Sequence, residues 1–518
     1  MKNSKYWENR ANERMAIYHK NSDRTINIVN KAYDKSVNNI EEEIKKIYNK
    51  FAIDGKLSPQ EARKLLNSKI STKELNEIRN KIEYIQDEDT KRYLLSILNS
   101  PAYKARITRL EALKQQVYIQ SKRIADVELR ATTSQYIDTI NESYYRNLYD
   151  IQKGLQLGFD VTMISNKTIE EILKNPWSGK QFSERIWNNT DVLAEKLIEI
   201  ITLGFMSGKS VDKMAKELQD YTEYGKFAAT RLVRTETTYM ANAAEMESYK
   251  ECDVEKYIYV ATLDSRTSAI CQSLDRKVFK VKDGVPGKNM PPMHPFCRST
   301  TRAYLGPDTL KGIKRRARDP ETGKTYLIPG DMSYKQWYQK YVVDKYGKDK
   351  AEIMKKKIIN KASDKKQYKR YKEVLGKDMP VKSFDKFQDL KYNDIEEWKR
   401  VKVLYRNVNW QLQAQKNIVE GSVHTVIFNA EPNSVFDNYR NGKIVSRRYY
   451  GRTGKPRLDI DLTDHNYPKI HKIVPHAHSW NFKDEPYVEA PEGLQGREKL
   501  GRKLTRAEEI ANKEIIKR

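Results

Sequence analysis

Apolar residues recur in steps of three and four along the first part of the chain, and this repeat most limits the folds open to it. Within residues 26–51 it comprises Ile26, Val29, Tyr33, Val37, Ile40, Ile44, Ile47 and Phe51. Such steps place one apolar stripe along an α-helix. Asp54 and Gly55 follow as a stop, because glycine readily takes the left-handed conformation that ends helices. We therefore predict a largely helical region over residues 1–155.

Capping signals indicate where further helices begin. A serine or threonine followed three residues later by glutamate forms a capping box, in which each side chain satisfies a backbone amide of the first turn. The boxes are Ser58 with Glu61, Ser71 with Glu74, and Thr505 with Glu508. Ser210 is a further N-cap candidate, and it precedes a long helix that includes residues 230–249. Helices are thus predicted in the first two parts of the chain and at its C-terminal end.

The pattern changes after this long helix. Residues 257–262 alternate in a way typical of a β-strand, and residues 277–281 form a second short candidate. Further strands are predicted at 423–428, 443–450 and 457–462. The sequence therefore predicts a multidomain α+β protein. Its four parts are a helical region (1–155), an α+β central domain (156–306), a basic helical connector (307–406) and a small, mostly β or α+β C-terminal domain (407–518).

Charge and length narrow the function classes. A chain of 518 residues exceeds one hydrophobic core. Its net charge of +27 favours an acidic partner, and residues 311–400 alone hold 26 Lys and Arg against 14 Asp and Glu. Two interpretations of that stretch stay open, a solvated helical linker and a surface that contacts nucleic acid.

Three classes of protein are disfavoured. No apolar stretch approaches the roughly 18 residues that span a bilayer, so we expect no membrane partner. The N-terminal residues lack the apolar core of a secretory signal. The three cysteines are too few for a disulfide scaffold and favour a reducing compartment.

Two cysteines and a histidine suggest a metal site. His294 and Cys297 have the spacing that lets one tight turn present both to a metal, and Cys271 precedes them. Zinc takes about four such ligands, and Asp264 is the fourth candidate. Two alternatives remain: buried cysteines with His294 capping the turn, and a catalytic Cys271–His294 pair.

The same stretch resembles a known family. The motifs lie at 176–179, 182–187, 228–236, 261–267, 271, 274–275, 291–292 and 294–300. In this order they resemble the phage head-morphogenesis family, the Mu F-like minor capsid proteins, most strongly over about 155–305. The resemblance implies a minor head protein that associates with the portal and enters the procapsid in a few copies. It also supports Cys271, His294 and Cys297 as metal ligands. The charged motif residues are Arg234, Glu236, Asp264, Arg266 and Arg298, and we expect a buried salt-bridge network among the first four.

A second cluster of candidates lies near the C-terminal end. In a strand, alternate residues share a face. Asp459 and Asp461 are therefore expected on one face of their strand, and His476 and His478 on one face of theirs. Histidines suit general acid and base catalysis near neutral pH. The candidate catalytic residues are Arg448, Asp459, Asp461, His465, His471, His476 and His478. Arg447, Arg448, Lys469 and Lys472 could hold a phosphodiester for metal-free cleavage. A metal site of His and Asp, or a purely structural cluster, are the alternatives.

Residues 448–480 also resemble modules appended to phage minor head proteins and to bacterial polymorphic toxins. Related toxin modules are often nucleases, and a toxin implies an immunity protein. Two functions follow as expectations. The first is a minor capsid protein at the portal vertex, inside the virion head or in the host cytoplasm during assembly. It would contact portal, capsid, scaffold and, through the connector, packaged DNA. The second is a toxin with a C-terminal nuclease.

Overall fold

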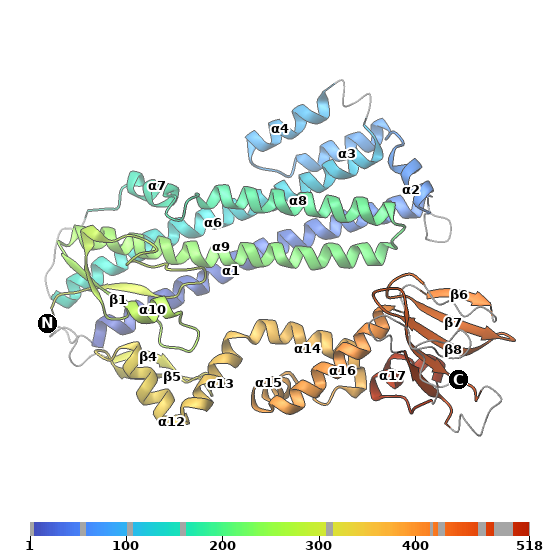
Figure 1. Ribbon diagram of the computed structural model, residues 1–518. Coiled ribbons are helices and arrows are strands. Elements are labelled where there is room, and N and C mark those ends of the chain that lie inside the picture. The colour runs from blue at the N-terminus through green and yellow to red at the C-terminus, as the bar shows by residue number, and fades with distance from the viewer. Residues whose placement is uncertain are drawn as a thin grey trace. The chain divides into compact units, whose positions relative to one another are not determined.

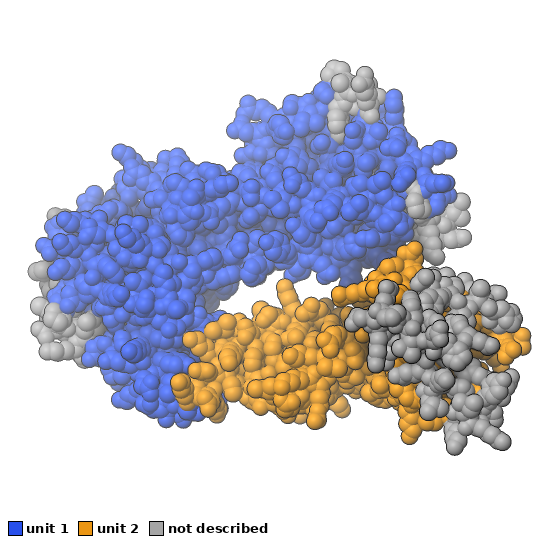
Figure 2. Space-filling model, viewed as in Figure 1, with its two compact units in different colours: residues 1–347 blue, residues 348–518 orange. Residues whose placement is uncertain are grey.

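The computed structural model describes residues 5–51, 58–100, 107–155, 162–306, 314–414, 418–422, 430–464, 473–480 and 501–516. They form two compact units, residues 1–347 and 348–518, which Figure 2 colours separately. The multidomain α+β prediction is confirmed, with a helical first part and small sheets in the central and C-terminal parts. The predicted boundary at 406/407 falls inside a helix, so the division into four parts stays a prediction.

Long helices build most of the first unit, as Figure 1 shows. They are α1 (Lys5–Phe51), α6 (Arg109–Leu155), α8 (Phe182–Met206) and α9 (Val211–Glu251). Shorter helices are α2 (Pro59–Leu66), α3 (Thr72–Ile82), α4 (Glu88–Asn99) and α7 (Asn166–Lys174). The predicted capping boxes open α2 and α3, and Ser210 caps α9.

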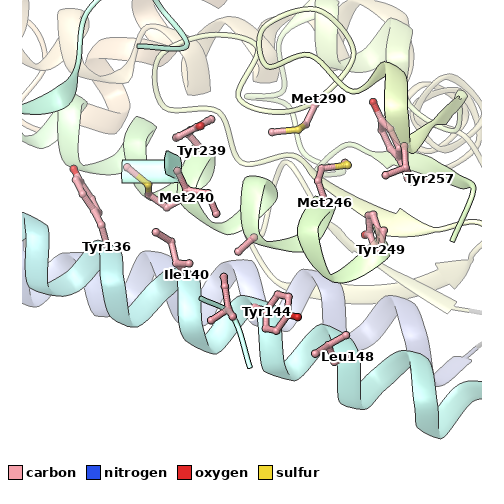
Figure 3. Packing of buried hydrophobic residues seen from close by; sticks show 14 of the residues in the cluster. Tyr136, Ile140, Tyr144, Leu148, Tyr239, Met240, Met246, Tyr249, Tyr257 and Met290 are labelled. Atoms are coloured by element: carbon pink, nitrogen blue, oxygen red, sulfur yellow. The ribbon is translucent and has the colours of Figure 1, made fainter. Parts of the chain in front are cut away.

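The predicted apolar stripe of α1 is buried from Ile26 to Ile44, while Ile47 is partly buried. It packs with Leu113 and Val117 of α6 and with apolar residues of α8 and α9. A second cluster, shown in Figure 3, places Tyr136, Ile140, Tyr144 and Leu148 of α6 near residues of α9 and the first strand. Burial of these apolar faces stabilises the bundle. Each Å² of apolar surface removed from water contributes roughly 25 cal/mol to the free energy of folding.

A small sheet follows α9. Its antiparallel order is β2-β1-β3, with β1 (Lys256–Val260), β2 (Val278–Lys280) and β3 (Thr300–Ala303). The two predicted strands are β1 and β2. Between them lies α10 (Ala269–Leu274), and η1 (Val281–Asp283) follows β2. A long loop from η1 to β3 carries His294 and Cys297.

The connector contains a two-stranded sheet that the sequence did not indicate. It is formed by β4 (Lys314–Arg318) and β5 (Thr325–Pro329). Arg315 of β4 is fully buried, where its guanidinium forms two hydrogen bonds with Asp275 at 2.8 and 3.0 Å. The unit ends with α11 (Tyr334–Trp337), the π-helix η3 (Tyr338–Val343) and α12 (Asp344–Tyr346).

The second unit begins with helices and ends with a sheet. The helices are α13 (Lys348–Ile359), α14 (Lys361–Leu375), η4 (Gly376–Asp378), α15 (Phe384–Asn393) and α16 (Ile395–Ala414). The sheet has the order β10-β9-β8-β7-β6, with β6 (Ile418–Ser422), β7 (Val435–Arg440), β8 (Lys443–Tyr450), β9 (Pro456–Asp461) and β10 (His476–Ser479). Its pairs are antiparallel except β6–β7.

The last helices are α17 (Arg506–Ala511), which opens on the predicted Thr505–Glu508 capping box, and α18 (Lys513–Ile516). Strands β8 and β9 were predicted, whereas the candidate strand at 423–428 lies outside the described residues. Within the described part of the chain, we find no helix with the length and apolar character needed to cross a bilayer.

Candidate functional site

Cys271, His294 and Cys297 converge in the first unit. Cys271 lies in the first turn of α10, which Ser268 caps. The other two residues share a tight turn, closed by the Cys297 amide donating to the His294 carbonyl at 3.1 Å. The hydroxyl of Thr238, on α9, donates to the Cys297 carbonyl at 2.7 Å and ties this turn to the bundle.

The three side chains have the separations that a tetrahedral metal requires. The Sγ of Cys271 lies 3.3 Å from Nε2 of His294 and 3.8 Å from Sγ of Cys297. Zinc–sulfur bonds of about 2.3 Å at tetrahedral angles set two thiolates about 3.8 Å apart. The ligand atoms of all three residues lie within 4.8 Å of one another. The donor set therefore fits a zinc ion with three protein ligands.

Hydrogen bonds prepare the donors for this role. The hydrogen bond with Cys297 is the first cause that lowers the pKa of Cys271, and the one with His294 also lowers it. The pKa of His294 is raised, first by Cys271, while Cys271 also raises the pKa of Cys297. His294 Nδ1 lies 2.8 Å from the Pro295 carbonyl, which orients Nε2 toward the cysteines. Such pairing favours a thiolate on Cys271, the form that binds metals.

Asp264 lies outside this group of ligands. Its carboxylate accepts two hydrogen bonds from the Arg298 guanidinium, at 2.5 and 2.9 Å, and is 3% exposed. Those bonds hold the pKa of Asp264 below its ordinary value, against the burial that is the largest influence on it. The Arg266 guanidinium is more distant, with Nη2 lying 3.8 Å from Oδ2 of Asp264. Asp264 thus orders the loop beside the cysteines.

The remaining motif residues have separate partners. Arg234 donates to the His19 carbonyl, Ser22 and Asp23 on α1. The buried Glu236 accepts a hydrogen bond from the Trp177 indole at 3.0 Å. The single network that we expected is therefore divided: Asp264, Arg266 and Arg298 form one group.

Sequence reasoning missed one neighbour of the site. The hydroxyl of Tyr259, on β1, donates to Cys271 Sγ at 3.2 Å and is fully buried. Tyr259 lies in the strand that the sequence predicted. The sequence did not show which way its side chain points, because that depends on how β1 pairs with β3.

A second cluster occupies one face of the C-terminal sheet. Asp461 pairs with His476 across β9 and β10, and Asp459 pairs with His478. The Asp461 carboxylate lies 3.4 Å from His478 Nε2 and 3.7 Å from His476 Nε2. All three side chains are buried, and their ligand atoms lie within 4.8 Å of one another. The predicted sharing of a face is therefore observed, and the group also has the donors of a metal site.

The arginines beside this cluster lie on opposite faces. Arg448 pairs with Asp459, donating to its two oxygens at 2.7 and 2.8 Å. Arg447 forms hydrogen bonds with Asp437, Asn512 and Glu514 on the other face. The two arginines therefore do not act on one phosphodiester together. The predicted His465, His471, Lys469 and Lys472 lie outside the described residues.

The family match concerns the first unit. Residues 195–302 match the family described as Phage Mu protein F like protein. This segment belongs to the Mu F-like family. The match links this segment to phage head morphogenesis. It spans residues 195–302 only and contains Cys271, His294 and Cys297, so the C-terminal sheet lies outside it.

Beyond the Mu F-like match, the chain is similar to a protein of Enterococcus faecalis (strain ATCC 700802 / V583), named NAD(+)--arginine ADP-ribosyltransferase EFV. The two are 24% identical over 212 residues, which cover 38% of this chain and 42% of that protein. The chain thus spans less than half the length of this relative. No solved structure matches the chain.

Proposed function

We propose that this chain is a phage minor head protein that associates with the portal vertex in the procapsid and lies inside the head. The observation that carries the proposal is the Mu F-like match over residues 195–302. That segment is continuous with the bundle, because α8 and α9 supply most of its helices. The bundle gives it a rigid support, and the exposed surfaces of the unit are available to portal, capsid and scaffold proteins.

The basic connector would contact packaged DNA. Helix α14 presents six exposed cations, which are Lys361, Lys365, Lys366, Lys369, Arg370 and Lys372. Of its two acidic residues, Asp364 is buried and Glu373 is exposed. Phosphate neutralisation by such cations gives binding that is independent of sequence and falls steeply with salt. The excess of exposed positive charge supports DNA contact over a merely solvated linker.

Zinc would bind Cys271, His294 and Cys297. The metal would tie the α10 turn to the loop before β3, as structural zinc sites do. The separations of 3.3 and 3.8 Å between the donor atoms support this role. Asp264 and Arg298 would hold the adjoining loop in place.

Residues 407–518 would be a passenger, and a nuclease is the second candidate function. The buried Asp461, His476 and His478 beside the Arg448–Asp459 pair support a chemically specialised face. The E. faecalis relative is named as an enzyme, which supports an enzymatic passenger on a chain of this type. If the passenger is a toxin nuclease, an immunity protein would accompany it.

Co-purification tests the head-protein proposal. The full chain is co-expressed with the portal protein of the same phage genome. The complex is sized by gel filtration in 0.1 M salt and then in higher salt, because higher salt screens exposed ion pairs. We expect one stable portal complex, and none with the portal of an unrelated phage. Separate elution of chain and portal in both salts would contradict the proposal.

A further inference from the structure

A cavity of about 820 Å³ opens beside the cysteine–histidine cluster in the first unit. Six parts of the chain line it: α1, α9, α10, the loops at 262–268 and 294–299, and the β4–β5 hairpin. Ligand pockets commonly have volumes of about 300 to 1,000 Å³. The cavity therefore has the size of a small-molecule site, and the proposed head function does not use it.

Cations dominate its lining. The lysine and arginines are Lys20, Arg234, Arg266, Arg298, Arg316 and Arg318. Among the described residues that line the cavity, Asp23 is the carboxylate, and it binds Arg234; Asp264, which does not line the cavity, binds Arg298. The described lining therefore carries more cations than carboxylates. Their field is also felt by His19, whose pKa is lowered to about 3 by burial and then by Arg234 and Arg298.

The arginines of β4 are directed by strand geometry. Alternation along β4 exposes Arg316 and Arg318 while Arg315 points into the core. Strand β4 is joined to the cavity loop, because the Arg318 amide donates to the Leu263 carbonyl at 2.9 Å. Gathering like charges at one place costs free energy, so it indicates an anionic ligand.

An aromatic ring lies among these charges. Phe296 has a φ of 59°, a left-handed conformation that costs a non-glycine residue roughly 1 kcal/mol or more. Its amide donates to Thr235 Oγ1 at 3.1 Å, and its ring lies 5.8 Å from that of Phe227. Such strain is concentrated at ligand sites. Met15 and Pro295 extend the apolar part of the wall.

We propose that this cavity binds a nucleotide, with its phosphate held by Arg266 and Arg316 and its base against Phe296. Guanidinium groups bind phosphate oxygens in a bidentate way, and every base has a face that stacks on an aromatic ring. The cavity is much larger than inorganic phosphate requires, which favours a ligand with a base. The nucleotide comes either from solution or from a nucleic-acid strand.

Calorimetric titration of the full chain tests the proposal, with adenosine 5′-monophosphate and the dinucleotide pTpT as probes. We expect saturable binding that Arg266→Gln and Arg316→Gln each weaken about ten-fold or more, as loss of a charged hydrogen bond implies. Two variants remove the same charge elsewhere: Arg130→Gln on α6, whose side chain is 50% exposed against 58% for Arg266, and Lys174→Gln on α7, whose side chain is 68% exposed. We expect no loss of affinity in either.

Each result is decisive. Tighter binding of pTpT than of the monophosphate assigns the site to a strand, and equal affinity assigns it to free nucleotide. The proposal is overturned if neither probe saturates at millimolar concentration, or if Arg130→Gln or Lys174→Gln weakens binding as much as Arg266→Gln. It is also overturned if inorganic phosphate competes as well as the monophosphate, or if tetraglutamate binds more tightly. None of these outcomes depends on portal binding.

Discussion

The indole nitrogen of Trp177 donates a hydrogen bond to the carboxylate of Glu236 at 3.0 Å. The two residues belong to motifs 59 positions apart, one before α8 and one within α9. Trp177 also stacks on Tyr239, with ring centroids 5.5 Å apart. Glu236 is 3% exposed, and its burial raises its pKa while the hydrogen bond from Trp177 opposes that rise.

We expect the stability of the first unit to fall as pH rises through the weakly acidic range. Burial raises the pKa of Glu236 to about 7, against 4.5 ordinarily. Below about pH 4.5 the folded and unfolded states both hold the proton. Between 4.5 and 7 only the folded state holds it, so stability decreases with pH, by on the order of 3 kcal/mol in total.

Glu236→Gln should remove the decrease in stability that ionisation of Glu236 causes. The glutamine keeps a side-chain oxygen that accepts the hydrogen bond from Trp177. The melting temperature at pH 8 is expected to rise, with little change near pH 5, where the native Glu236 is protonated. Glu128, whose pKa burial raises to about 8, adds a slope of the same sign that the variant leaves in place. Glu171→Gln on α7, 65% exposed, is the matched control. An equal melting shift at both pH values would contradict the argument.

Removing the Asp264 charge is expected to destabilise the loop beside the cysteines. Asp264→Asn leaves the Arg298 guanidinium without its bidentate partner, at a cost of about 2 kcal/mol, since hydrogen bonds to charged groups contribute about 1.5 to 3. Urea unfolding measures it. Asp89→Asn breaks an exposed pair with Arg92 at 2.6 Å and should cost under about 1 kcal/mol. Equal losses would show that Asp264 has no special role.

The cysteine–histidine group is expected to hold zinc in the purified full chain. Cys297→Ser and His294→Gln should each lower the zinc content by about one equivalent, because a site with two protein ligands binds far more weakly. Cys252→Ser serves as control, since Cys252 caps the end of α9 and lies outside the group. Elemental analysis gives the content, and His478→Gln separates any metal bound in the C-terminal cluster. Equal zinc in the native chain and Cys297→Ser would contradict the assignment.

Nuclease activity of the passenger is tested with labelled RNA and DNA, with and without divalent metal. If the histidines act in catalysis, His476→Ala and His478→Ala should each slow cleavage by about 10²-fold or more. His19→Gln, in the other unit, should leave the rate unchanged. Absence of cleavage under every condition, or equal rates in all variants, would end the nuclease proposal.

Local signals predicted much of this architecture. The stripe from Ile26 to Ile44 and the three capping boxes depend on residues close in sequence, so they could be recognised directly. The turn that joins His294 to Cys297 is also local.

Contacts distant in sequence were harder to predict. Asp264 had the chemistry of a metal ligand, and only folding shows that Arg298 engages it. The β4–β5 hairpin escaped prediction because its alternation buries Arg315, a residue that sequence patterns count as exposed. Likewise, the approach of Asp461 to His478 depends on the register of β9 and β10.

The account depends most on the chain being a head protein. The most direct measurement is quantitative mass spectrometry of purified procapsids, assembled from the neighbouring structural genes with this chain included. We predict that the chain is retained after a high-salt wash, in a few copies per particle, and is protected from added protease until the particles are opened. Procapsids that lack the chain, or that lose it to protease while intact, would contradict the account.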